Sequence, residues 1–193
     1  MTIINIRGTN GSGKTTLVRG LMAAAVGEVE KVGARVAKPT GYRFNLKDKH
    51  GVVLPTFVLG SYENINGGCD TIKTQDEACD LVRRYAPDHN VVFEGVLISV
   101  LYDRYRKLDK ELTTQGHTFI WGFMDTPVQT CIDRVLARRV ARGADIKDFD
   151  PNNSITPKHK QCINVRAKAK GTGSAIVKDI PHQNAVAEVL TWL

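Results

Sequence analysis

The sequence predicts one α/β domain in which helices cover both faces of a parallel sheet. Short apolar runs typical of strands alternate with longer segments whose apolar residues recur at helical spacing. Such alternation implies right-handed crossovers between parallel strands. The length of 193 residues suits one domain, and no repeat or low-complexity tract divides it. We therefore assign residues 1–193 to a single domain.

The elements are expected in this order. Strands are expected at residues 2–7, 34–38, 90–94, 117–123 and 175–178. Helices are expected from the loop after the first strand to about Lys31, and at residues 75–85, 96–112, 127–142, 157–170 and 184–193. The polar stretch 45–51 between two apolar runs indicates a small hairpin inserted in the main fold. Thr126 should cap the helix that Pro127 opens, and residues 143–157 should form a polar lid.

The segment from Gly8 to Thr15 reads Gly-Thr-Asn-Gly-Ser-Gly-Lys-Thr, the complete Walker A pattern of a phosphate-binding loop. Its glycines let backbone N–H groups turn toward an anion, and the helix that follows presents its positive end to the same anion. Lys14 should reach the β- and γ-phosphates of a nucleotide, and the Thr15 hydroxyl should coordinate Mg²⁺. The other nucleotide contacts are expected from Asn10, Gly11, Ser12, Gly13 and Thr16.

Two carboxylates are candidates for the chemical step. Glu94 ends an apolar strand, where it would join the Mg²⁺ shell or polarise the attacking hydroxyl; the alternative is a glutamate that faces solvent. Asp70 follows the tandem glycines Gly67 and Gly68 and is the leading candidate for the group that accepts the proton, with Glu94 as its competitor. The alternative for Asp70 is a capping role at the helix expected over residues 75–85.

The positive charge is concentrated in one segment. The chain has 27 Lys and Arg against 20 Asp and Glu, and the ten basic and three acidic residues from Arg134 to Lys170 account for the whole excess of +7. Such a segment favours a polyanionic partner. Arg134, Arg138 and Arg142 recur every four residues along one helix. We expect Arg138 and Arg142 to stabilise the phosphoryl group in transfer and Arg139 to contact the nucleotide, although a solvated arginine face is the alternative.

The Walker A loop, the strand end at Glu94 and the arginine-rich helix before a polar lid together resemble the small P-loop kinases that phosphorylate nucleotides and polynucleotides. The resemblance covers almost the whole chain. It implies a three-layer P-loop NTPase fold with a five-stranded parallel sheet, ATP as the phosphate donor and Mg²⁺. Within this group, residues 67–71 and 92–95 resemble phage-borne kinases that act on 5-hydroxymethyluracil bases within DNA.

These observations favour an ATP-dependent kinase that phosphorylates a hydroxyl on nucleic acid, most specifically the hydroxymethyl group of 5-hydroxymethyluracil in phage DNA. A base within a duplex has to be flipped out to react, and Tyr42, Phe57 or Tyr62 would stack on it. A nucleoside or nucleoside-monophosphate kinase is the alternative, because such an enzyme also needs arginines in its lid. A P-loop ATPase or GTPase that acts as a switch is a third possibility, and the chain carries no Asn-Lys-x-Asp motif for guanine.

The composition also bears on the compartment. The four cysteines, Cys69, Cys79, Cys131 and Cys162, are far apart, which favours reduced thiols over disulfides or a zinc site. No apolar run approaches the roughly 20 residues of a membrane helix, and the first residues predict a strand in place of a secretory leader. We expect a cytoplasmic protein, in the host cytoplasm if phage-encoded, that acts as a monomer or homodimer without a membrane partner.

Overall fold

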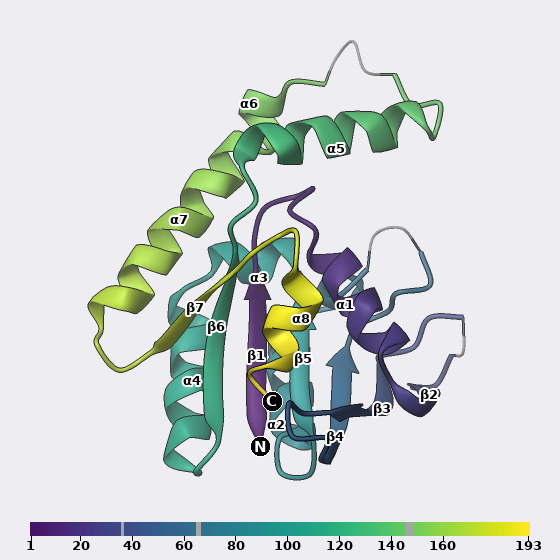
Figure 1. The fold of residues 1–193 in the computed structure, drawn as a ribbon. Coiled ribbons are helices and arrows are strands. Elements are labelled where there is room, and N and C mark those ends of the chain that lie inside the picture. Colours follow the sequence, from purple (N-terminus) through teal and green to yellow (C-terminus); the bar gives the residue numbers. More distant parts are fainter. Residues whose placement is uncertain (36, 65–66, 146–148) are drawn as a thin grey trace.

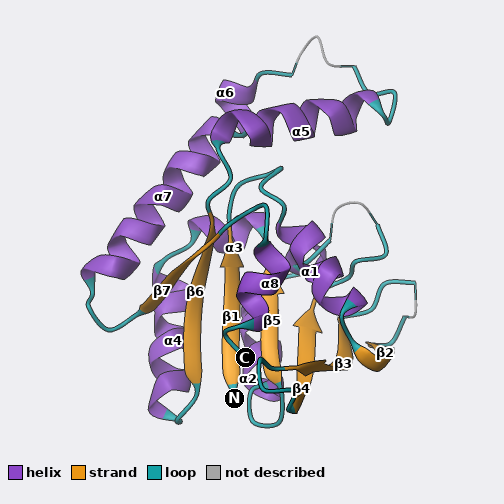
Figure 2. Ribbon diagram, viewed as in Figure 1, coloured by secondary structure: helices purple, strands orange, loops and turns teal. Residues whose placement is uncertain are grey.

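Strand β1 (Thr2–Arg7) lies inside the sheet with a neighbouring strand on each side, and every residue after its first is buried. The structure is a computed structural model that describes residues 1–35, 37–64, 67–145 and 149–193. Within these ranges, seven strands form one sheet in the order β2-β3-β4-β5-β1-β6-β7, and helices pack on both of its faces (Figures 1 and 2). The predicted α/β class is confirmed.

The bounds of several elements match the prediction. The other strands are β2 (Val26–Val32), β3 (Gly41–Lys47), β4 (Val53–Leu59), β5 (Asn90–Glu94), β6 (Thr118–Met124) and β7 (Ile176–Ile180). The helices are α1 (Lys14–Ala23), α2 (Gln75–Tyr85), α3 (Val96–Val100), α4 (Asp103–Thr114), α5 (Val128–Val140), α6 (Pro151–Ser154), α7 (Thr156–Gly171) and α8 (Ala185–Leu190), with a short 3-10 turn at Cys69–Thr71. The first strand, the strand at 90–94 and the helix at 75–85 have the bounds expected from the sequence.

The sheet is mixed, which differs from the five parallel strands expected. Strands β4, β5, β1, β6 and β7 pair with their neighbours in parallel, whereas β2, β3 and β4 pair antiparallel. The expected hairpin is formed by β3 and β4. Because β4 also pairs with β5, this hairpin extends the main sheet and is not an insertion outside it.

The largest error of the sequence prediction concerns residues 24–38. The first helix ends at Ala23, well before Lys31, and the chain then forms the edge strand β2. Val26, Val29 and Val32 have the three-residue spacing of a helix, but valine is β-branched and Gly27 has a φ of +84°, so the segment pairs with β3 instead. No strand forms at the described residues of 34–38, and Val36 lies outside them.

Three other expectations need correction. Residues 96–112 form two helices, α3 and α4, because the chain leaves helical geometry at Leu101. Thr126 does not cap α5: its hydroxyl donates to the carbonyl oxygen of Ser12, and Pro127 takes the capping position without a side-chain bond. The expected lid is partly helical, since it contains α6 and the start of α7, and residues 146–148 lie outside the described part.

The two faces of the sheet have separate cores because side chains alternate along each strand. Ile3 of β1 packs on one face with residues of α2, α3, α4 and α7, whereas Ile4 and Ile6 pack on the other with residues of α1 and α8. Helix α5 lies apart from both cores. It crosses above the carboxyl ends of the strands and continues through α6 into α7 (Figure 1). No helix in the described ranges is long and apolar enough to cross a membrane.

Candidate active site

The Walker A segment forms the turn between β1 and α1, at the carboxyl edge of the sheet where parallel α/β folds bind ligands. Its backbone requires glycine. Gly11 and Gly13 have φ values of +78° and +98°, and a Cβ atom on Gly11 would lie 2.3 Å from the carbonyl oxygen of Cys131 in α5. The loop therefore follows a path that ordinary residues rarely adopt, in close contact with the helix above it.

We call residues 126–145 and 149–158, which contain α5, α6 and the start of α7, the arm. Among the described residues, three hydrogen bonds join the arm to the Walker A loop. The Thr126 hydroxyl donates to the Ser12 carbonyl over 2.7 Å, and Arg134 donates to the Gly11 carbonyl over 3.3 Å. From the loop, the Thr9 hydroxyl donates to the carbonyl of Ile155 over 3.2 Å. These bonds hold the arm, although much of its sequence is polar, against the Walker A loop.

Lys14 and Thr15 begin α1 and line the cleft beneath the arm. The Lys14 Nζ donates to the carbonyl oxygens of Gly8 and Thr9, at 2.8 and 3.0 Å, so the ammonium group is held within the curve of the loop. The Ser12 Oγ is buried and has no hydrogen-bond partner among the described residues. A buried hydroxyl without a partner and an ammonium group in one loop fit an anion with several oxygen acceptors.

Glu94 ends β5 directly beside this loop. Its Oε1 accepts a hydrogen bond of 2.9 Å from the Thr15 hydroxyl, and only 2% of the residue is exposed. Burial raises the pKa of Glu94, and the charge of Lys14 and the bond from Thr15 oppose this shift without cancelling it. The sequence alternative of a solvent-facing glutamate is therefore wrong.

The tandem-glycine segment packs against the Glu94 carboxylate. Gly68 has a φ of +81°, and a Cβ atom there would lie 2.6 Å from the Glu94 Oε1. Only glycine lets the backbone come this close. This contact brings the short turn at Cys69–Thr71, and with it Asp70, to the same cleft as Lys14.

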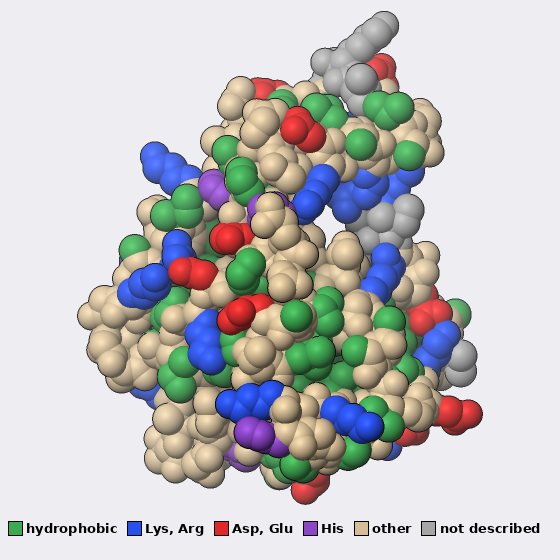
Figure 3. Space-filling model, in the orientation of Figure 1, with side chains coloured by type: hydrophobic (Ala, Val, Ile, Leu, Met, Phe, Trp, Pro, Cys, Tyr) green, Lys and Arg blue, Asp and Glu red, His purple; other side chains and the backbone are tan. Residues whose placement is uncertain are grey.

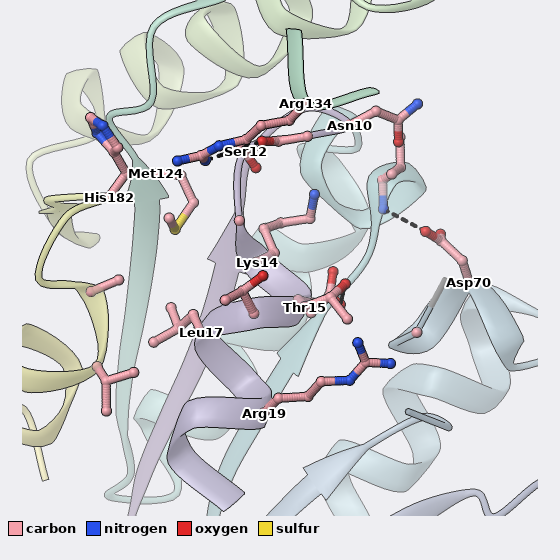
Figure 4. A pocket seen from close by; sticks show the side chains of 18 of the residues that line it. Asn10, Ser12, Lys14, Thr15, Leu17, Arg19, Asp70, Met124, Arg134 and His182 are labelled. Carbon is pink, nitrogen blue, oxygen red and sulfur yellow. Dashed lines mark hydrogen bonds between the residues drawn. The ribbon is translucent and has the colours of Figure 1, made fainter. Parts of the chain in front are cut away.

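Asp70 holds the start of α3. Its Oδ2 accepts from the backbone N–H of Val96 over 2.9 Å, and its Oδ1 lies 3.4 Å from the N–H of Leu97 (Figure 4). The alternative role expected for Asp70 was to cap α2. Thr74 caps that helix instead, because its side chain accepts a hydrogen bond from the N–H of Glu77. Asp70 is exposed and lines the cleft, and its carboxylate oxygens can each accept a further hydrogen bond.

The arginines of α5 divide between two sides of the helix. Arg134 and Arg138 line the cleft, and Figure 3 shows blue side chains gathered on the side of α5 that faces it. Burial, followed by the charge of Arg142, lowers the pKa of Arg138. Arg139 turns away: it donates to the Asp145 carbonyl and lies over the ring of Phe149. Arg139 and Arg142 are not among the described residues that line the cleft.

The cleft has a volume of about 1070 Å³ and extends to both sides of the loop. Figure 4 shows Met124 and His182 on one side and Asp70 and Arg19 on the other, with Lys14 between them. The cleft residues that the sequence analysis did not name as site candidates include Leu17, Arg19, Val96, Leu97, Met124, Lys158 and His182.

Sequence patterns could have indicated some of these cleft residues. Arg19 lies one helical turn after Thr15, so a four-residue spacing indicates it. His182 follows the end of β7, at the edge of the sheet where the loop lies. No such pattern indicates Leu97.

The aromatic residues expected to stack on a base are inside the protein. Phe57 is fully buried and stacks on Tyr85 with ring centroids 3.5 Å apart. Tyr42 is buried, and its hydroxyl bonds to Glu63 and to the backbone N–H of Tyr62. Tyr62 itself is 5% exposed. The stacking role is therefore wrong for Tyr42 and Phe57. Near Tyr62, the backbone carbonyl oxygen of Asn64 accepts a hydrogen bond from the guanidinium of Arg19.

A Mg²⁺ ion would find suitable oxygen ligands here. The described residues contain no cluster of three or more His, Cys, Asp or Glu that would form an all-protein metal site. Mg²⁺ usually takes one or two carboxylates and completes its shell with phosphate oxygens and water. The Thr15 hydroxyl beside the Glu94 carboxylate fits that pattern.

Comparison with known proteins connects this site to one set of relatives. No protein-family model matches the chain. It is 36% identical to a 5-hmdU DNA kinase of Pseudomonas phage PaMx11 over 178 residues, which are 91% of this chain and 89% of that protein. It is 32% identical to a 5-hmdU DNA kinase of Pseudomonas phage M6 over 193 residues, or 98% of this chain and 96% of that protein. A 5-hmdU DNA kinase of Delftia phage PhiW-14 is 32% identical over 73% of this chain and 54% of that protein.

Proposed function

The chain belongs to the family of phage proteins named 5-hmdU DNA kinase and is therefore a phosphotransferase, and from this premise we propose that it transfers the γ-phosphoryl group of ATP to the hydroxymethyl group of 5-hydroxymethyluracil in DNA. The observation that carries the proposal is the convergence of Lys14, Thr15, Glu94 and Asp70 on one cleft. These groups come from three separate segments of the chain. Together they offer a phosphate cradle, oxygen ligands for a metal ion and a proton acceptor.

The triphosphate would lie in the curve of the loop. Backbone N–H groups from Asn10 to Thr16 and the Lys14 ammonium would bind the β- and γ-phosphates, and the buried Ser12 hydroxyl would gain a partner. Thr15 and Glu94 would hold Mg²⁺. When bound, this ion neutralises charge that develops on the phosphate oxygens.

The two sides of the cleft would take different substrates. The side with Asp70 suits the acceptor, because the hydroxyl that attacks must meet a proton acceptor there. The donor nucleoside would then occupy the opposite side, near Met124 and His182. In the reaction, the hydroxymethyl oxygen forms a bond to the γ-phosphorus, the bond to the β-phosphate oxygen of ATP breaks, and the acceptor proton passes to Asp70.

The arm would supply positive charge during transfer. Arg138, with Arg134 and Lys158 beside the same cleft, is placed to contact phosphate oxygens as their charge shifts toward the leaving group. The excess of +7 that the sequence concentrates between Arg134 and Lys170 also supports DNA as the acceptor, because Lys and Arg contacts to the backbone supply most nonspecific affinity.

The experiment is a transfer assay with γ-labelled ATP. The acceptors are DNA that contains 5-hydroxymethyluracil, the same DNA with thymine, and the free modified nucleoside and its monophosphate. We expect label in the modified DNA alone, and none when EDTA is present or when Lys14 is replaced by alanine. Label that appears only in the nucleoside or monophosphate would reject the polymer as substrate and identify a nucleotide kinase.

A further inference from the structure

An apolar side chain stands exposed beside the carboxylates of the cleft. Leu97 follows Glu94 by three residues, lines the cleft, and is 53% exposed. Its neighbour Val96 lines the same side. Large aliphatic side chains lose stabilisation when they face water, by about 25 cal/mol for each Å² of apolar surface left exposed. A single exposed leucine is common on protein surfaces, but this one lines the cleft next to Asp70, where a bound acceptor would meet it.

The backbone beneath Leu97 is fixed at both ends of α3. At the start, the Asp70 carboxylate accepts from the N–H groups of Val96 and Leu97. At the end, the buried guanidinium of Arg7 donates to the carbonyl of Leu101 over 3.0 Å. Within the helix, the Ser99 hydroxyl donates to the Gly95 carbonyl and accepts from the N–H of Gly8 in the phosphate loop. The position of Leu97 is thus set relative to both the loop and Asp70.

The described residues that were expected to stack on the acceptor base present no exposed aromatic ring to it. The three aromatic residues expected to stack on it, Tyr42, Phe57 and Tyr62, are all at most 5% exposed. A base that leaves the helical stack loses contacts worth a few kcal/mol, and a pocket normally replaces them with apolar surface. Among the described residues, Leu97 and Val96 are the aliphatic side chains that line the cleft next to Asp70.

We propose that Leu97 packs against the ring of the acceptor pyrimidine and so positions its hydroxymethyl group toward Asp70, which rests on the function proposed above. The hydroxymethyl carbon lies in the plane of the pyrimidine ring. With its oxygen at Asp70, the ring would lie within reach of the start of α3, because Asp70 bonds directly to that turn. Leu97 is a specificity-determining residue in this arrangement, since it contacts the base and not the reacting atoms.

The test compares steady-state kinetics of Leu97→Ala with those of the wild-type chain. The substrates are single-stranded DNA and duplex DNA, each with one 5-hydroxymethyluracil. We expect the KM for both DNAs to rise about tenfold, the size of effect seen when an apolar contact to a substrate is lost, while the KM for ATP stays unchanged. Leu97→Met keeps an apolar side chain of similar volume and should restore most of the affinity.

Val53→Ala is the matched control. Val53 is also aliphatic and 48% exposed, but it begins β4 and so lies at the opposite edge of the sheet. It should leave every constant unchanged. Thermal denaturation of each variant, with and without ATP and Mg²⁺, checks that the fold and the donor site persist.

The outcomes separate the inference from the function beneath it. A wild-type chain that labels modified DNA, together with a Leu97→Ala variant whose KM for DNA is unchanged, would overturn the role of Leu97 alone. A KM that rises for duplex DNA only would also overturn the role of Leu97. That result would indicate that Leu97 acts as a wedge that opens the duplex and does not contact the base. A wild-type chain that labels no modified DNA would overturn the proposed function and this inference with it.

Discussion

The hydroxyl of Thr15 donates a 2.9 Å hydrogen bond to the carboxylate of Glu94, although 79 residues separate them along the chain. This bond joins the first turn of α1 to the end of β5, the strand that pairs with β1. It also holds a carboxylate in an environment where charge is costly, since burial raises the pKa of Glu94. The metal-binding role proposed for Glu94 would therefore oppose stability, and the two effects can be measured separately.

The first prediction concerns Glu94→Gln and pH. A raised pKa means that the folded state binds more protons than the unfolded state once the pH exceeds 4.5, the ordinary value for glutamate. The free energy of unfolding of the wild-type chain should therefore fall as the pH rises from about 4.5 through the raised pKa. Glutamine cannot ionise and still accepts the bond from Thr15, so the variant should lose less stability over that range.

Urea unfolding at a series of pH values between 4 and 8 measures this difference. The variant should be the more stable chain at neutral pH, and the gap should close toward pH 4. Glu28→Gln makes the same change at an exposed position on β2 and should follow the wild-type curve. Parallel curves for Glu94→Gln and the wild type would contradict the prediction.

The second prediction separates the two carboxylates. In single-turnover assays, Asp70→Asn and Glu94→Gln should each slow phosphoryl transfer by at least about 10²-fold, the range for loss of a general base or of a metal ligand's charge. Their dependence on Mg²⁺ should differ. Glu94→Gln removes charge beside Thr15, so added Mg²⁺ should partly restore its rate, whereas Asp70→Asn should not respond. An Asp70→Asn variant with near-normal turnover would reduce Asp70 to a support for α3.

The fold was predictable where local sequence and final environment agree. The apolar run at β5 is buried on both faces, and Thr74 caps α2 by its side chain, so both elements had the correct bounds. The segment after Ala23 behaves differently. Its valines repeat at helical spacing, but pairing with β3 decides its structure, and the paired residues lie 9 to 19 positions further along the chain. Such non-local pairing cannot be read from periodicity.

The candidate site shows the same division. The Walker A spacing located the loop, and the strand end located Glu94, because both depend on short segments. The partners of Asp70 were missed because they belong to α3, which lies 26 residues away in sequence. The orientation of Arg139 was not predictable either. Neighbouring residues on a helix point about 100° apart, and in the folded chain Arg138 lines the cleft while Arg139 lies over the Phe149 ring.

The third prediction concerns these arginines. Arg138→Ala should lower kcat by at least about 10²-fold, as expected for removal of one group that stabilises charge in the transition state. Arg139→Ala should have a much smaller effect on kcat. Its main loss is the contact over the Phe149 ring, worth about 0.5–1 kcal/mol of arm stability. Comparable losses of kcat in the two variants would show that the arm rotates when the substrate binds.

The fourth prediction concerns Arg7, whose guanidinium is fully buried at the end of β1. Its centre lies 4.1 Å from the ring centroid of Trp121 and 5.3 Å from that of Tyr105. No salt bridge to Arg7 is found among the described residues. The carbonyl of Leu101 and the two aromatic rings stabilise its positive charge instead. Arg7 therefore joins the strand before the phosphate loop to the helix that carries Leu97.

Arg7→Ala should destabilise the fold by about 3 kcal/mol or more, because it opens a cavity beside Trp121 and leaves the buried carbonyl of Ser99 and the carbonyl of Leu101 without their donor. In a chain of this length, such a loss lowers the midpoint of thermal unfolding by about 6–12 °C. Arg84→Ala, which removes a guanidinium 5.9 Å from the Tyr85 ring on the exposed side of α2, should shift the midpoint by much less. If the two variants melt together, the buried contacts of Arg7 do not hold α3 in place, and the position of Leu97 has to be fixed by the Asp70 carboxylate and the Ser99 hydroxyl.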